Sequence, residues 1–451
     1  MFLCTALFLA TAATTDAQPL HLSLAGAIDR ALRSGTQAEL ARSAEERARI
    51  ARYEALYNLF PQADARVLRY NQSINLATFG FTIPGQPPVI GPFNVTDAQI
   101  TTAMQVFNIA ALRRYAAFRQ GEAASRYAAQ AADNDVAAAV ARLYVLVQRV
   151  DAQIAARGAD VTLFEQLARL ADDQFKAGTG TRLDVAQANV QLSRARQALL
   201  VARNDREAAR LALLNAIAED ESQELVLDEP LPVSASAPAL AAALAPARSA
   251  RPELREMEAR EKEARLTVEA ARARHLPSVA FDFEGDLSGN RTSDMHWTRR
   301  IAGTVSVPLF RADVETNVAR ARNQLHEVEL ERAQRERDVE QDVRRSILSL
   351  ENASARVTVA EETVRVAEEA LTVARDRRDA GYGSAVEVDR AQDVYRQAHE
   401  DLIAARADLA AAGYDVKHAM GAPAASPAPQ PNPAAGPAAD QPASRRRAEA
   451  P

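Results

Sequence analysis

Residues 343–374, VRRSILSLENASARVTVAEETVRVAEEALTVA, carry an apolar side chain at every seventh position. This spacing places the side chains along one face of an α-helix, and small residues three positions further on let a neighbouring helix approach closely. The pattern therefore predicts a long helix that packs along a coiled-coil seam. The predicted seam consists of Val343, Leu350, Val357, Val364 and Leu371, with Ala353, Ala360, Ala367 and Ala374 as its small residues.

The helix is predicted to extend far beyond this stretch, because no proline interrupts residues 311–379. At about 1.5 Å per residue it would reach on the order of 100 Å, more than a globular core requires. Residues 109–177 have a similar pattern and predict a second long helix. Each long helix precedes a glycine-rich turn, and shorter helices are predicted to return along residues 182–218 and 385–420.

The chain also contains an internal repeat. Residues 105–218 align with residues 308–421 without a gap, and the turn AGTGT at 177–181 falls on AGYGS at 380–384. Fixed-distance self-similarity of this kind indicates a duplicated structural unit. The chain is therefore predicted to be mainly helical with some strands, in two copies of a unit that runs helix, strand, strand, long helix, helix.

Alternating polar and apolar residues predict the strands. Val279, Phe281 and Phe283 alternate with Asp282 and Glu284, which is typical of a strand with one face toward lipid and one toward water. Four strands cannot close a membrane barrel, which needs about eight. They form either a soluble sheet or a share of a barrel pooled among several chains. The predicted strands cover about 62–74, 95–107, 278–288 and 298–310.

The long helices alone fit an ordinary coiled coil as well as a barrel of helices. Together with the strands they favour an exported, multimeric pore.

The two ends of the chain differ from the rest. Residues 1–17 hold an apolar run and a small-residue cleavage site, and we interpret them as a signal peptide that lacks the usual leading positive charge. A short buried helix is the alternative. Residues 422–451 are rich in Pro and Ala and predict a disordered tail. The predicted repeats cover residues 18–218 and 251–421, with a connector at 219–250.

Composition excludes several classes of protein. The 451 residues include 54 Lys and Arg against 60 Asp and Glu, so there is no basic excess for binding nucleic acid. Cys4 is the single cysteine, and the six histidines are scattered without metal-site spacing. Neither a Walker-type loop nor a Gly-x-Ser-x-Gly motif occurs. We therefore expect no enzyme activity, no cofactor and no metal site.

The motifs at the predicted helix and strand boundaries resemble those of the TolC family of outer-membrane channels. VSVPLF at residues 305–310 is similar to the family's strand-to-helix junction, and Leu276-Pro277 to its helix-to-strand entry. AGTGTRLDV at 177–185 and GYGSAVEV at 381–388 resemble the family's hairpin turn. The resemblance covers roughly residues 20–421.

The resemblance implies a homotrimer in which each chain supplies four strands to a 12-stranded barrel in outer-membrane lipid. A barrel of twelve helices would continue it through the periplasm. Members of the family are exit ducts of tripartite efflux pumps and type I secretion systems. They conduct substrates passively from an inner-membrane RND, ABC or MFS transporter through a periplasmic adaptor.

The resemblance also implies roles for the two turns, which would form the periplasmic tip. Asp184 and Glu387 fall where the family places pore-constricting acids, although an acid in a first helical turn also complements the helix dipole. Arg390 occupies the family's second acidic position and could pair with Glu387, which predicts a weaker gate. Adaptor docking is expected at Gly178, Gly180, Thr181, Gly381, Gly383 and Ser384.

The alternative function is a soluble periplasmic coiled-coil scaffold or adaptor. Two equivalent hairpins fit it poorly, since an adaptor would have one hairpin and a lipoyl-like module. Drugs, metals and proteins are all compatible as cargo.

Overall fold

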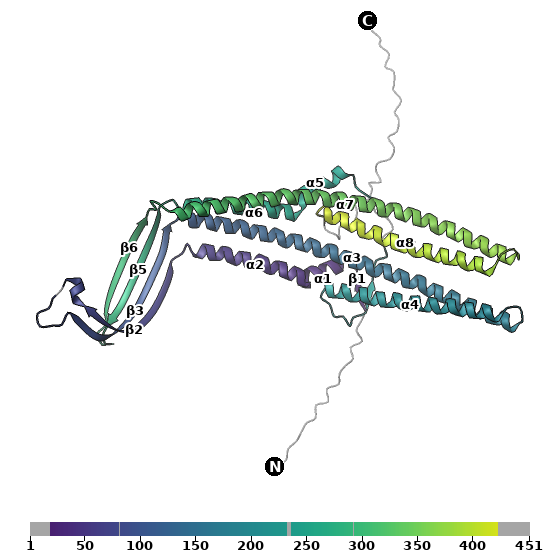
Figure 1. Ribbon diagram of the computed structural model, residues 1–451, viewed down its shortest axis with the longest axis horizontal. Coiled ribbons are helices and arrows are strands. Elements are labelled where there is room, and N and C mark those ends of the chain that lie inside the picture. The colour runs from purple at the N-terminus through teal and green to yellow at the C-terminus, as the bar shows by residue number, and fades with distance from the viewer. Residues whose placement is uncertain (1–18, 81, 232–235, 292, 423–451) are drawn as a thin grey trace, which may run out of the picture.

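The computed structural model describes residues 19–80, 82–231, 236–291 and 293–422. It is an elongated molecule with a β-sheet at one end and two helical hairpins that reach to the other (Figure 1). The signal peptide expected at 1–17 and nearly all of the tail expected at 422–451 lie outside the described residues.

The two halves of the chain present their main elements in the same order. Helices α3 and α7 each have 68 residues, and the helices that follow them each have 35. The first half contains β1 (Leu20–Leu22), α1 (Leu24–Ser34), α2 (Thr36–Tyr57), β2 (Gln62–Asn75), the 3-10 helix η1 (Leu76–Phe79), β3 (Val89–Phe107), α3 (Ile109–Lys176), α4 (Arg182–Ala216) and β4 (Leu225–Leu227). The second contains α5 (Leu240–Ala250), α6 (Pro252–Ala273), β5 (Ser278–Gly289), β6 (His296–Ser306), α7 (Ala312–Asp379) and α8 (Ala385–Ala419).

The predicted heptad seam is confirmed along α7. Val343 and Leu350 are 0% and 2% exposed, and Ala353 and Ala367 are buried with them. Val343, Leu350 and Ala353 pack against Leu402 and its neighbours on α8 and against α5. Small residues at the seam bring the two helices close enough for this continuous contact.

Tyr144 lies at the centre of the core of the first half. Its side chain is 1% exposed and packs among residues from α1, α3, α4 and the short β1–β4 sheet. Its hydroxyl donates a hydrogen bond of 3.0 Å to the Leu22 carbonyl. The residue therefore links the first strand of the chain to the long helix.

The four longer strands form one sheet in the order β2–β3–β5–β6, with all neighbours antiparallel. Strand β3 begins at Val89 rather than at the expected residue 95, because β2 and β3 remain paired after a bulge near Gln72. Strand β6 ends at Ser306 rather than at 310, since Pro308 cannot donate to a strand ladder.

The sheet has one polar face, which crosses all four strands. Arg66 donates a 2.7 Å hydrogen bond to Gln99, and Gln99 in turn donates to Glu284. Glu284 also pairs with Arg300 of β6 at 2.6 Å. The opposite face carries apolar residues such as Ile301, which is 60% exposed.

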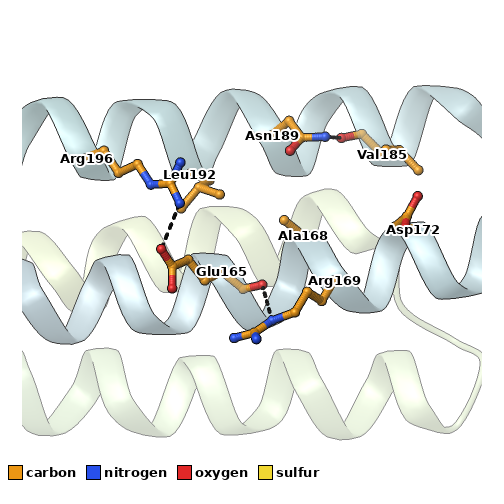
Figure 2. Close-up of a pocket in the computed structure, with 8 residues that line it drawn as sticks. All are labelled: Glu165, Ala168, Arg169, Asp172, Val185, Asn189, Leu192 and Arg196. Atoms are coloured by element: carbon orange, nitrogen blue, oxygen red, sulfur yellow. Dashed lines mark hydrogen bonds and ion pairs between the residues drawn. The ribbon is translucent and has the colours of Figure 1, made fainter.

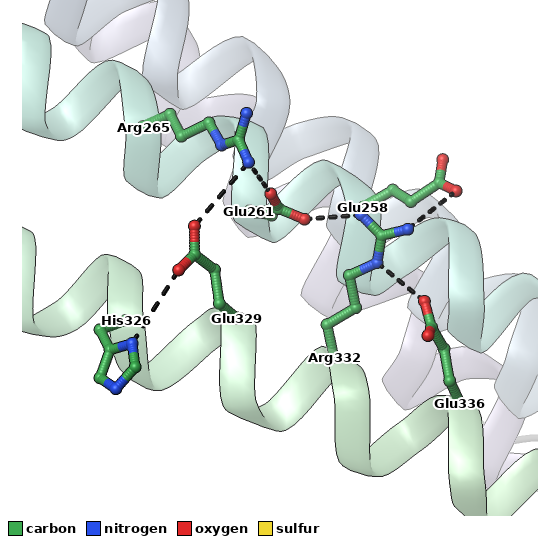
Figure 3. A network of polar contacts seen from close by, with 7 residues as sticks. All are labelled: Glu258, Glu261, Arg265, His326, Glu329, Arg332 and Glu336. Atoms are coloured by element: carbon green, nitrogen blue, oxygen red, sulfur yellow. Dashed lines mark hydrogen bonds and ion pairs between the residues drawn. The ribbon is translucent and has the colours of Figure 1, made fainter.

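A network of ion pairs connects α6 to α7 (Figure 3). Arg332 of α7 reaches Glu261 at 2.6 Å and Glu258 at 3.8 Å on α6, and also pairs with Glu336 on its own helix. Arg265 extends the network to Glu329. The Glu261 side chain is only 10% exposed, so these arginines compensate a largely desolvated carboxylate.

Helix α3 joins the two halves. Arg157 pairs with Glu400 at 2.6 Å, and Arg142 pairs with Asp415 at 2.7 Å, both on α8. On its other side α3 packs closely against α6: a Cβ atom added at Gly121 would lie 3.0 Å from Oε1 of Glu263.

This close packing leads to a pH-dependent prediction at Glu263. Burial raises the pKa of Glu263 above its ordinary value. The contribution of the protonated Glu263 side chain to the stability of the folded protein is therefore complete at low pH. It is lost as the pH rises through the raised pKa. Glu263→Gln should raise the thermal midpoint at pH 7 but not at pH 4. Glu331→Gln, at an exposed site on α7, should change neither midpoint. If Glu263→Gln changed the thermal midpoint equally at pH 4 and pH 7, the raised pKa of Glu263 would be contradicted.

Candidate functional site

Both hairpin turns lie at the end of the molecule remote from the sheet (Figure 1). Gly178 and Gly381 have φ angles of +75° and +78°, which L-residues rarely adopt. At the next glycine the chain passes close to its own helix: a Cβ atom at Gly383 would lie 2.8 Å from the Arg378 nitrogen. Glycine is therefore required at both turns to reverse a long helix within five residues.

The first turn ends in a reciprocal cap. The Thr181 hydroxyl accepts the Asp184 N–H at 3.2 Å, and the Asp184 carboxylate accepts the Thr181 N–H at 2.8 Å and its O–H at 2.7 Å. These hydrogen bonds hold the pKa of Asp184 below its ordinary value. The side chain is thus engaged in starting α4.

The second turn differs in its acidic residue. Ser384 accepts the Glu387 N–H at 3.3 Å, but Glu387 does not return a hydrogen bond to the cap. Among the residues that the structure describes, neither Glu387 nor Arg390 takes part in an ion pair, so the pairing considered from their spacing does not form in the single chain. Both side chains are exposed.

Asp389 is a further acid at this tip that sequence reasoning missed. Partial desolvation of the Asp389 carboxyl raises its pKa, and the nearby Arg378 guanidinium partly opposes the shift. Arg378 also contributes to lowering the pKa of Asp184, on the other hairpin. The proximity of Asp389 and Arg378 depends on the fold of the turn, and no spacing motif in the sequence indicates it.

The capping box supports a prediction at the first turn. Thr181→Ala removes the acceptor for the Asp184 N–H, and loss of such a cap typically costs about 1 kcal/mol. The first turn of α4 should therefore exchange its amide hydrogens about fivefold faster, as measured by mass spectrometry. Thr181→Ser retains the hydroxyl and should leave the exchange rate unchanged. Equal rates in both variants would contradict the capping role.

Above the first turn, a shallow groove runs between α3 and α4 (Figure 2). Glu165 of α3 pairs with Arg196 of α4 at 2.8 Å across it. Leu192 and Ala168 contribute apolar side chains to its lining, and Asp172 contributes a carboxylate. The mixture of charge and small apolar surface suits contact with another helix better than enclosure of a small molecule. In the described ranges, no three His, Asp or Glu side chains are placed to hold a metal ion.

No helix in the described part of the chain is long and apolar enough to cross a bilayer.

A four-stranded sheet with one polar and one apolar face, joined to two long helical hairpins, is the architecture of a channel subunit. The comparisons agree. A family model described as outer membrane efflux protein matches residues 92–219 and 243–422. The chain belongs to this family, and the resemblance to TolC-type channels is confirmed.

Solved structures show the same fold. The Campylobacter jejuni CmeC outer membrane channel is 17% identical, with a TM-score of 0.74 over 88% of this chain and 85% of that one. The outer membrane protein VceC from Vibrio cholerae is 16% identical, with a TM-score of 0.74 over 88% and 96%. The open-state Neisseria gonorrhoeae MtrE outer membrane channel is 20% identical, with a TM-score of 0.73 over 88% and 89%.

No curated protein sequence matches the chain. The family is described as one of outer membrane efflux proteins, and CmeC and MtrE are described as outer membrane channels.

Proposed function

We propose that three copies of this chain form an exit duct in the outer membrane. Each copy contributes four strands to a 12-stranded barrel and two hairpins to a helical barrel in the periplasm. The duct passively conducts substrates delivered by an inner-membrane RND, ABC or MFS transporter and a periplasmic adaptor, in an efflux or type I secretion system.

The observation that carries this proposal is the sheet with two unlike faces and two free edges. Strands β2 and β6 have partners on one side only within the described chain. Open edges of this length pair readily with another chain, and closure into a barrel removes them. The apolar face is strongly exposed in one copy, with Val67 at 74% and Val305 at 66%. Lipid would cover this face in the barrel.

The helices support the same assembly. Val359, Val366 and Val373 of α7 recur every seven residues and are 66%, 49% and 51% exposed. An apolar heptad stripe outside the buried seam is suited to a second helix partner. Helices from a neighbouring copy would provide that partner in a trimer.

The hairpin tips are the proposed contact with the adaptor. Leu183, Tyr382 and Val386 are 65%, 84% and 54% exposed beside the two turns. Exposed apolar residues on an otherwise charged surface are typical of a protein-binding site. These three lie within or directly beside the turn residues named from the sequence and would extend the docking surface.

Fractionation of a Gram-negative host tests the proposed function. The chain should occur in outer membranes and migrate on SDS gels as a trimer without heating and as a monomer after boiling. That monomer should be slightly smaller than the 48.8 kDa of the full chain, because export removes the signal peptide. Recovery wholly from the soluble periplasm would contradict the channel and favour the scaffold function.

The free carboxylate of Glu387 is the proposed source of ion selectivity. Three-fold symmetry would place three such groups around the pore, where they attract cations and repel anions. Glu387→Gln should lower the cation-over-anion permeability ratio several-fold in planar bilayers. Asp184→Asn is the comparison variant at the first turn. The Asp184 carboxylate keeps its charge, but its hydrogen bonds to Thr181 hold it at the start of α4, so its loss should change the ratio less. Unchanged selectivity in Glu387→Gln would remove this residue from the gate.

A further inference from the structure

The β2–β3 hairpin is longer than the rest of the sheet. Strand β3 pairs with β5 only as far as Thr96 opposite Gly289, whereas β2 and β3 continue to pair with each other from Tyr70–Val95 to Asn75–Val89. We name this overhang, residues 70–79 and 89–95, the outer hairpin. It lies at the end of the sheet remote from the helices and projects past β5 and β6 (Figure 1).

In the outer hairpin, the polar face of the sheet becomes apolar and the apolar face becomes polar. Directly paired residues of neighbouring strands point to the same side. The polar face, which holds Arg66 opposite Gln99, continues outward as Tyr70 opposite Val95 and Gln72 opposite Phe93. Aromatic and apolar groups thus follow polar ones along a single face.

The other face changes in the opposite sense. It begins with Val67 opposite Ala98 and continues as Asn71 opposite Asn94, whose side-chain amides are joined by a 3.1 Å hydrogen bond. Where a strand extends from the lipid bilayer into water, its outward face is expected to become polar in this way. The inversion therefore places the outer hairpin beyond the bilayer with its apolar side over the pore.

The outer hairpin also lacks charge. Residues 70–96 contain no Asp, Glu, Lys or Arg, although a quarter of the whole chain is charged. Tyr70 is 40% exposed, and Phe79 at the end of η1 is 67% exposed. Contacts around a symmetry axis bring each group against its own copy, so any charge there would repel itself. An uncharged apolar surface is the composition that such a contact requires.

From the inverted faces and the absence of charge, we infer that the outer hairpins of three copies meet across the three-fold axis and narrow the external mouth of the channel. This inference rests on the proposed trimer. The occupant of the apolar face is thus a second copy of this chain. The face is continuous with the proposed lining of the pore, and the bulge near Gln72 permits the hairpin to bend. An apolar constriction excludes water and resists ions.

Cysteine crosslinking tests the contact with an internal control. In a Cys4→Ser background, Tyr70→Cys places a thiol on the apolar side and Asn71→Cys places one on the opposite side. A short bis-maleimide added to intact cells should link Tyr70→Cys chains into dimers on boiled SDS gels. Asn71→Cys should remain monomeric on those gels, although it reacts with a membrane-impermeant maleimide.

Conductance provides a second readout. Phe93→Asp places three like charges on the inferred contact and should raise single-channel conductance at least twofold. Asn94→Asp adds the same charge on the outer side and should leave conductance unchanged. This inference would be overturned if heat-modifiable trimers formed but Tyr70→Cys gave no crosslink and Phe93→Asp did not change the conductance. That result would leave the proposed function intact. Chains that never form trimers would overturn both.

Discussion

Tyr144→Ala is expected to lower the free energy of unfolding by about 3–5 kcal/mol, the range for removing a buried aromatic ring. The ring is 1% exposed and contacts the elements that surround the middle of the first half. Its removal leaves a cavity that α3, a 68-residue helix, cannot close by local movement. The urea midpoint of the purified protein, followed by circular dichroism, measures the change.

Tyr144→Phe separates the ring from its hydroxyl. It keeps the packing and removes one of two donors to the Leu22 carbonyl, which still accepts the Asp228 N–H at 3.2 Å, so a cost of about 0.5–1.5 kcal/mol is expected. Burial, reinforced by the charge of Glu229, raises the pKa of Tyr144 to about 12. The stabilising contribution of the neutral phenol is thus complete below pH 10 and is lost as the pH rises through about 12. If Tyr144→Ala were no less stable than Tyr144→Phe, the ring would not be part of the core.

Ile301→Lys is expected to reduce outer-membrane insertion strongly. Ile301 lies on the apolar face of β6, opposite Phe283, and is 60% exposed in the single chain. A lysine facing lipid near the middle of the bilayer costs about 2–4 kcal/mol per strand, and a trimer would contain three. The fraction of heat-modifiable trimer in purified outer membranes measures the effect.

Thr304→Lys is the matched control on the same strand. Its side chain points to the polar face, and its partner in the ladder is Ala280. In the proposed barrel this face lines the water-filled pore, so trimer yield should stay near that of the unmodified chain. Equal loss of trimer in both variants would contradict the assignment of the faces, and equal retention would contradict a lipid-facing role for Ile301.

Much of the fold could be predicted because its signals are local. The heptads of α7, the glycine pentads and the alternation in β5 each fix the conformation within a few residues. The start of β3 at Val89 could not be predicted in this way. Pro and Gly in that segment indicate a loop, and only its pairing with Asn75 of β2 shows that the strand continues.

The candidate site was predicted less completely. The sequence placed Asp184 and Glu387 at equivalent positions, yet the structure gives the first a reciprocal cap and leaves the second free. A threonine and an aspartate close the capping box at one turn, whereas Ser384 forms only half of it. The difference depends on side-chain conformation, which residue spacing does not specify.

The sequence by itself determined that this protein consists of long hairpins and a two-faced sheet, because helical and strand periodicities are properties of neighbouring residues. Only the tertiary structure decided which distant residues meet. Arg157 and Glu400 form a bridge between the halves, and a register that places Tyr70 opposite Val95 turns the polar face apolar. Such contacts depend on how separate elements align in space, and no local pattern in the chain encodes that alignment.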